Sequence, residues 1–137
     1  MYDGLADGLV RPQLPTHSLD MALFHITTCA AWESAQAHGE YSAPSLATEG
    51  FIHLSEDRQW LVTANRFYCG VRDLVLLEID ADRLSAEVRR EPADGDHYPH
   101  LYGALNLDAV TGVFALPLDD DGAITLPPDL GRRPHRG

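Results

Sequence analysis

Two histidines occupy matching contexts in this sequence of 137 residues. His25 lies in an apolar segment and is followed two positions later by Thr27, and His53 lies in a second apolar segment with Ser55 at the same spacing. Imidazole titrates near neutral pH, so a histidine on rigid backbone can exchange protons with a substrate. If the two segments lie side by side, both imidazoles open onto one cleft. The alternative is that each ring is buried and hydrogen-bonded to backbone.

A second group of polar and aromatic side chains lies in residues 97–103 (His-Tyr-Pro-His-Leu-Tyr-Gly). His100 and Tyr102 are expected to form polar walls of a pocket, and a proline-turned loop pinned by aromatic packing is the alternative. The two histidines of this segment, joined by His53 or Asp96, could supply three metal ligands. Their spacing lacks the i, i+4 helical pairing of strong zinc motifs, so no metal site is predicted.

Four other side chains have both a chemical and a structural interpretation. Glu91 ends a predicted strand, where a carboxylate could act as a base or bind a sugar hydroxyl. Arg58 and Arg66 are the best-placed cations after the second histidine and could hold a phosphate, with surface solvation as the alternative. Cys29 falls in the first turn of a predicted helix, where the helix dipole favours the thiolate. We interpret it as a small buried side chain.

The elements that must position these residues follow from the apolar pattern. Strands are expected over residues 22–27, 51–55, 74–79, 86–91 and 110–116, and one helical turn over 107–110. Helices are expected over 29–38, capped by Thr28 and stopped by Gly39, and over 56–69, capped by Ser55. Residues 42–49 and 92–97 are expected to be loops, and residues 98–107 irregular. This order predicts an α+β fold.

Composition limits the class of protein. The chain is 45% hydrophobic and 23% charged, which is typical of a globular domain. One domain is expected over residues 21–118. A mobile arm (1–20) is expected before it, and a tail that is first acidic and then Pro- and Arg-rich (119–137) after it. A formal charge of -11 argues against a broad nucleic-acid surface or an anionic membrane, but not against a single nucleotide held by a local pair of arginines. No membrane span or secretory signal is visible, and two cysteines fit a reducing cytoplasm.

Three segments together resemble a bacterial protein family, the domain of unknown function 952 family. They are residues 24–27 (Phe-His-Ile-Thr), 50–55 (Gly-Phe-Ile-His-Leu-Ser) and 99–103 (Pro-His-Leu-Tyr-Gly). The resemblance covers about residues 22–117, and the last two segments are quite specific to the family. Its members are small cytoplasmic proteins with a fold similar to that of the ADP-ribosyltransferases. The resemblance therefore implies a split, strongly curved β structure with two N-terminal strand–helix units and a cleft for NAD.

The wider superfamily also implies residue roles. There, a first-strand His or Arg holds the NAD ribose, a second-strand motif supplies an aromatic, Ser or His residue, and a late Glu or Gln orients the reacting sugar. Carried over by position, His25 would position the substrate, His53 would do acid–base work and Glu91 would orient the ribose. The expected substrate-binding residues are Thr27, Ser55, Arg58, His100 and Tyr102.

The resemblance thus implies NAD or another ribosyl phosphate as ligand, with ADP-ribosyl or phosphoribosyl transfer as the chemistry. NAD would be a substrate, and no resident cofactor is expected. Two alternatives stay open. The sequence lacks a Glu-x-Glu or Gln-x-Glu signature and has tyrosines in the late segment instead. That departure favours a non-catalytic nucleotide- or ligand-binding module on the same fold, and a histidine-metal hydrolase is the further alternative.

Overall fold

The computed structural model of the chain describes residues 22–128 and 130, so the predicted arm and the end of the predicted tail lie outside the described residues. The helices are α2 (Cys29–His38), α3 (Pro44–Glu49) and α4 (Trp60–Tyr68), with 3-10 turns η1 (Ala81–Arg83) and η2 (Leu107–Ala109). The strands are β1 (Ala22–Thr28), β2 (Glu40–Tyr41), β3 (Ile52–His53), β4 (Leu74–Asp80), β5 (Glu87–Ala93), β6 (Asp96–Tyr102), β7 (Leu105–Asn106) and β8 (Val110–Ala115). The α+β class is confirmed. None of the described helices is long and apolar enough to span a membrane.

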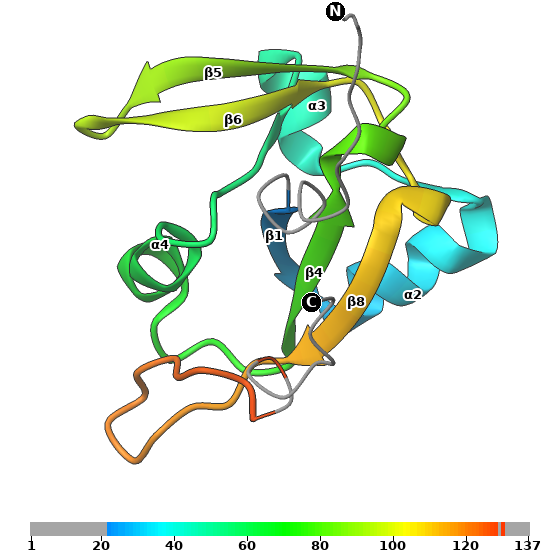
Figure 1. The fold of residues 1–137 in the computed structure, drawn as a ribbon. Helices are drawn as coiled ribbons and strands as arrows, with labels where there is room; N and C mark the ends of the chain where they lie inside the picture. The colour runs from blue at the N-terminus through cyan, green and yellow to red at the C-terminus, as the bar shows by residue number, and fades with distance from the viewer. Residues whose placement is uncertain (1–21, 129, 131–137) are drawn as a thin grey trace, which may run out of the picture.

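The strands form three small antiparallel sheets, in the orders β1-β4-β8, β3-β6-β5 and β2-β7. Figure 1 shows β1, β4 and β8 side by side in the middle of the molecule, with the β5–β6 hairpin above them and α4 to one side. Phe24 of β1 and Ser55 after β3 exchange two backbone hydrogen bonds of 2.8 Å. This bridge fixes the first sheet against the second, and it brings the segments that carry His25 and His53 together.

β4 is the central strand, as its apolar sequence predicts, and it separates two hydrophobic clusters. Leu77 and Ile79 belong to one cluster, which includes Ala35 of α2. Leu76 belongs to the other, which includes Trp60 of α4. Successive side chains of a strand point to opposite faces, so one apolar strand serves both clusters. The helices α2 and α4 therefore cover opposite faces of the β1-β4-β8 sheet.

The ends of α2 agree with the prediction, whereas the start of α4 does not. The Thr28 hydroxyl accepts a hydrogen bond of 3.0 Å from the Ala31 N–H, and Gly39 ends the helix with φ 93°. Ser55 does not cap a helix, because its backbone is engaged with Phe24 and α4 begins only at Trp60. The prediction of Ser55 as a helix cap was wrong, because Ser55 pairs with β1 instead.

Two segments expected to be irregular are regular. Residues 42–49 contain α3, in which Pro44 takes the first helical position, where the missing N–H costs nothing. Residues 92–107 contain the end of β5 and all of β6 and β7, and the turn between β5 and β6 is only Asp94 and Gly95, with φ 51° and 82°. Asp-Gly with two positive φ angles is a favoured two-residue hairpin turn. The local signal was therefore present within the stretch expected to be a loop.

The folded unit continues beyond the predicted boundary at residue 118. Leu118 and Ile124 form an isolated antiparallel bridge. Ile124 is buried in the same cluster as Trp60. In addition, the side-chain amide of Asn65 in α4 donates to the Ile124 carbonyl oxygen at 2.9 Å, and its oxygen accepts from the Ile124 N–H at 2.7 Å. The start of the predicted tail is thus part of the core on the α4 side.

Gly103, directly after β6, lies close to Ala86. We therefore expect the effects of substitutions at these two positions on stability to be coupled. A methyl group on Gly103 would lie 2.7 Å from the Cβ of Ala86. We expect Gly103→Ala to lower the free energy of unfolding by about 1–3 kcal/mol through this overlap. In the double variant with Ala86→Gly the overlap is gone, so the two losses should not add. Urea unfolding of all four proteins tests this, and losses additive within about 0.5 kcal/mol would contradict it.

Candidate functional site

Two hydrogen bonds hold the ring of His25 in the middle of β1. Nδ1 lies 2.7 Å from the carbonyl oxygen of His53, and Nε2 lies 2.8 Å from the hydroxyl oxygen of Tyr41. The Tyr41 oxygen is in turn 3.0 Å from the hydroxyl oxygen of Thr27. A carbonyl oxygen only accepts, so Nδ1 carries the ring proton and Nε2 accepts from Tyr41. His25 therefore ties β1 to β2 and β3 and orients a tyrosine.

The burial of this ring determines its charge. Burial lowers the pKa of His25 to about 4, and the hydrogen bond to the His53 carbonyl raises it only in part. Burial also raises the pKa of Tyr41. At neutral pH the pair is consequently an uncharged imidazole and an uncharged phenol. Both ring nitrogens of His25 have protein partners, so this side chain can act on a ligand only through Tyr41 and the His53 backbone.

A groove of about 610 Å³ lies beside this network and is lined by β1, β3, α4 and the turn of the β5–β6 hairpin. Both His25 and His53 line it, and so do Thr27 and Ser55. Further polar lining comes from the hydroxyl groups of Tyr41, Ser45, Thr63 and Tyr98. The other predicted site residues do not line the groove. They are Arg58, Glu91, His100 and Tyr102.

Glu91, His100 and Tyr102 instead form a hydrogen-bonded cluster on β5 and β6. One carboxylate oxygen of Glu91 accepts from Nδ1 of His100 at 2.7 Å and from the Tyr102 hydroxyl at 2.5 Å. These two hydrogen bonds lower the pKa of Glu91, and the neighbouring carboxylate raises the pKa of Tyr102. The guanidinium carbon of Arg89 lies 4.7 Å from the centre of the Tyr102 ring. Glu91 is therefore an ionised residue that fixes two side chains of the late segment.

Phe51 and His53 connect this cluster to the groove. The Phe51 ring stacks on His100 at 4.1 Å between centroids and 12° between planes, and it meets the edge of His53 at 4.9 Å. His53 and His100 are paired in the β3–β6 register. Nε2 of His53 lies 3.3 Å from a carboxylate oxygen of Glu49, and the His53 side chain is 52% exposed. A solvent-accessible imidazole beside a carboxylate is an arrangement suited to acid–base chemistry.

His100 is buried, and it lies outside the groove that His25 and His53 line. It is 4% exposed, and its Nε2 has no hydrogen-bond partner among the described residues. The carboxylate of Glu91 holds the proton on Nδ1, which leaves Nε2 as an unused acceptor. An unpaired buried acceptor costs about 1–3 kcal/mol. The predicted pocket wall is thus a buried support beneath Phe51.

Arg58 and Arg66 are paired with carboxylates at the tip of the β5–β6 hairpin. The two terminal nitrogens of Arg58 lie 2.9 and 3.3 Å from the carboxylate oxygens of Asp96, and Gln59 adds a third hydrogen bond of 3.0 Å. These contacts lower the pKa of Asp96. Arg66 lies 3.9 Å from Asp94. Arg58 is thus paired with the hairpin through two hydrogen bonds, whereas Arg66 makes only one long contact with it, and neither arginine lines the groove.

The metal interpretation has no support in the geometry. His97 and His100 are three positions apart on a strand, so their side chains leave opposite faces of β6. Within residues 22–128 and 130, no group of three or more His, Cys, Asp or Glu residues is arranged to hold a metal ion. Cys29 was expected to be buried and is only half-buried, packed against the core, and both ring nitrogens of His25 are engaged elsewhere.

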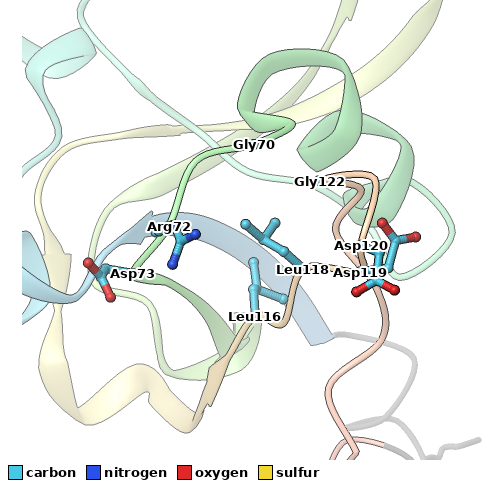
Figure 2. Close-up of a pocket in the computed structure, with 8 residues that line it drawn as sticks. All are labelled: Gly70, Arg72, Asp73, Leu116, Leu118, Asp119, Asp120 and Gly122. Atoms are coloured by element: carbon cyan, nitrogen blue, oxygen red, sulfur yellow. The ribbon is translucent and has the colours of Figure 1, made fainter.

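A second hollow of about 480 Å³ lies between the segment after α4 and the segment after β8. Figure 2 shows Arg72 and Asp73 at one end, acidic side chains at the other, and Leu116 and Leu118 between them. The Asp119 carboxylate accepts backbone hydrogen bonds from Asp121 and Ala123, and so organises its own turn. This hollow contains none of the predicted site residues.

Tyr41 and Glu49, which contact His25 and His53, are among the site residues that sequence reasoning missed. Tyr41 lies in a two-residue strand, and nothing local distinguishes it from any buried tyrosine. Glu49 ends α3 and stands four positions before His53. The sequence predicts a loop and not a helix over residues 42–49, so the Glu49 carboxylate has no predicted position relative to His53.

The comparisons with known proteins agree on the family. A family model described as a protein of unknown function, DUF952, matches residues 26–113. The crystal structure of protein CC0527 from Caulobacter crescentus is 34% identical with a TM-score of 0.71, and the match covers 77% of this chain and 94% of that one. The solution NMR structure of the same protein is 32% identical with a TM-score of 0.68, covering 82% and 97%. No curated protein matches. The chain belongs to the DUF952 family.

Proposed function

We propose that this protein binds NAD or another ribosyl phosphate, with the ribosyl part in the groove between His25 and His53. The observation that carries the proposal is that two histidine-bearing strands meet at one groove whose lining is rich in hydroxyl groups. Hydroxyl and imidazole groups are donors and acceptors for the hydroxyl groups of a sugar. Aromatic side chains such as Phe67 and Tyr98 offer flat apolar faces for a base ring. The resemblance to proteins with an ADP-ribosyltransferase-like fold supports the same class of ligand.

In this proposal His53 is the residue that does chemistry and His25 is a positioning residue. The exposed ring of His53 can reach a ligand and has Glu49 as a proton partner. His25 holds the His53 backbone and the Tyr41 hydroxyl in place. Ser55 and Thr27 contribute groove hydroxyl groups beside them. A transfer reaction would use His53 to protonate the leaving group or to activate the acceptor.

Ligand binding without turnover is the second candidate, and one observation favours it. A ribosyl transferase needs a carboxylate close to the reacting sugar, whereas Glu91 lies outside the groove and is occupied by His100 and Tyr102. Asp94 is the carboxylate that lines the groove. Turnover separates the two candidates, because a binding module returns NAD intact and a transferase releases nicotinamide.

Ligand binding is tested by thermal unfolding with NAD, ADP-ribose and nicotinamide. A ligand at 100 times its Kd adds about 2.7 kcal/mol to the free energy of unfolding, a shift of several degrees in Tm for a domain of this size. We expect the shift to disappear in His53→Ala with the fold intact by circular dichroism. The matched control is His97→Ala, which removes an exposed histidine that does not line the groove. An unchanged shift in His53→Ala, or none in the wild type, would refute the proposal.

A further inference from the structure

The charges around the groove are unusual for a site that takes a phosphorylated ligand. Among the described residues that line the groove, Asp94 is the only Asp, Glu, Lys or Arg. Its side chain is an acid. His25 adds no positive charge at neutral pH, since burial lowers its pKa to about 4. A proton gained by His53 is balanced by Glu49 at 3.3 Å. The groove itself therefore offers no unbalanced cation.

The arginines beside the groove do not change this balance. Arg58 is engaged by Asp96 through two nitrogens, and Arg66 has Asp94 at 3.9 Å. Each guanidinium is thus matched by a carboxylate of the hairpin. The whole chain has a formal charge of -11, which adds a long-range repulsion toward anions. A phosphate placed in the groove would face the Asp94 carboxylate and would find no arginine in the lining to balance its charge.

The remaining lining suits a ligand that carries hydroxyl groups and a ring but no negative charge. Thr27, Ser55 and Thr63 contribute hydroxyl groups, and Phe67 and Tyr98 contribute aromatic rings. Aromatic faces attract cations as well as flat neutral rings. Asp94 at the hairpin turn adds to the preference for a cation.

Building on the proposed function, we propose that the groove selects the uncharged or cationic nucleoside part of its ligand and keeps phosphate groups outside. For NAD, this means that a nucleoside end enters the groove while the two phosphates remain in solvent. A free nucleoside should then bind better than the same nucleoside with a 5′-phosphate. A site built around a phosphate would show the opposite order of affinities, with the 5′-phosphate binding more tightly than the nucleoside.

The experiment compares two matched pairs by isothermal titration calorimetry: nicotinamide riboside with its 5′-phosphate, and adenosine with its 5′-phosphate. At low salt we expect at least one nucleoside to bind about tenfold more tightly than its phosphate, from the Coulomb energy of an unscreened dianion near a carboxylate. Added salt should narrow the difference, because it screens the repulsion. Asp94→Asn should also narrow it, since it removes the carboxylate and frees Arg66. Asparagine tolerates the positive φ of this position.

The control is Asp82→Asn, which makes the same change in net charge at an exposed residue outside the groove. It should leave the preference unchanged. Tighter binding of both phosphates than of their nucleosides would overturn the inference and leave the proposed function standing. An equal effect of the two Asn variants would overturn the role of Asp94. No binding of the four probes or of NAD would overturn the inference and the proposed function together.

Discussion

Trp60→Ala is expected to lower the free energy of unfolding by about 3–5 kcal/mol. Trp60 is 1% exposed and packs against Phe24, with ring centroids 6.3 Å apart. It fills the cluster that joins α4 to β1 and β4 and to Ile124, so truncation leaves a large cavity among four segments of chain. Domains of this size are stable by about 5–15 kcal/mol, so the loss takes a large fraction of the total. Urea unfolding followed by far-ultraviolet circular dichroism measures it without relying on tryptophan fluorescence.

The control for this prediction is the other tryptophan, Trp32. It lies on α2 and is only half-buried at the margin of the opposite cluster, so Trp32→Ala should cost clearly less. Equal losses at the two positions would contradict the expectation that the deeper burial of Trp60 makes its truncation more costly. Because Thr63 and Phe67 of the same helix line the groove, Trp60→Ala should also weaken ligand binding. It is therefore a stability probe, and binding roles are better assigned with His53→Ala.

The parts of the fold that the sequence predicts are those with a strong local signal. β4 is an uninterrupted apolar run, and α2 begins at a threonine cap and ends at a left-handed glycine. Each of these signals lies within a few residues of sequence, so it can be read without knowing the tertiary contacts. The strand predicted over residues 86–91 agrees with β5, whereas α3 and β6 are not predicted, because proline and glycine are usual breakers; here Pro44 starts a helix and Gly95 closes a hairpin.

The candidate site could be predicted only in part, since its contacts join distant strands. The resemblance between the contexts of His25 and His53 pointed to one groove, and both line it. Their connection through a backbone carbonyl depends on the bridge between β1 and the end of β3, which no local pattern specifies. Likewise, the partner of Arg58 is Asp96, 38 positions away along the chain. Such pairings depend on how distant segments of the chain meet in the fold, so the sequence indicated the chemistry of these residues but not their partners.

The second large effect is expected on acidification, and it comes from His25. Its folded pKa of about 4 lies below the value of about 6.5 for an unfolded histidine, so the unfolded chain binds a proton more readily between those values. The contribution of His25 to stability is therefore complete above pH 6.5 and is lost as the pH falls toward 4. The difference between the two pKa values corresponds to about 3 kcal/mol.

Comparison with His25→Gln isolates this loss, because the variant has no charge to gain there while the other titrating groups remain. Urea unfolding between pH 4 and 8 should show the wild type losing about 3 kcal/mol more than the variant over that range. The physical reason lies in the network: a proton on Nε2 would face Tyr41, which must then give up its own hydrogen bond to the ring, in a site that solvent hardly reaches. Parallel pH profiles for the two proteins would mean that the folded imidazole gains a proton as readily as an unfolded histidine does, and so is charged at acidic pH. Its hydrogen bonds to Tyr41 and the His53 carbonyl would then both be donated, and the groove would contain a cation after all.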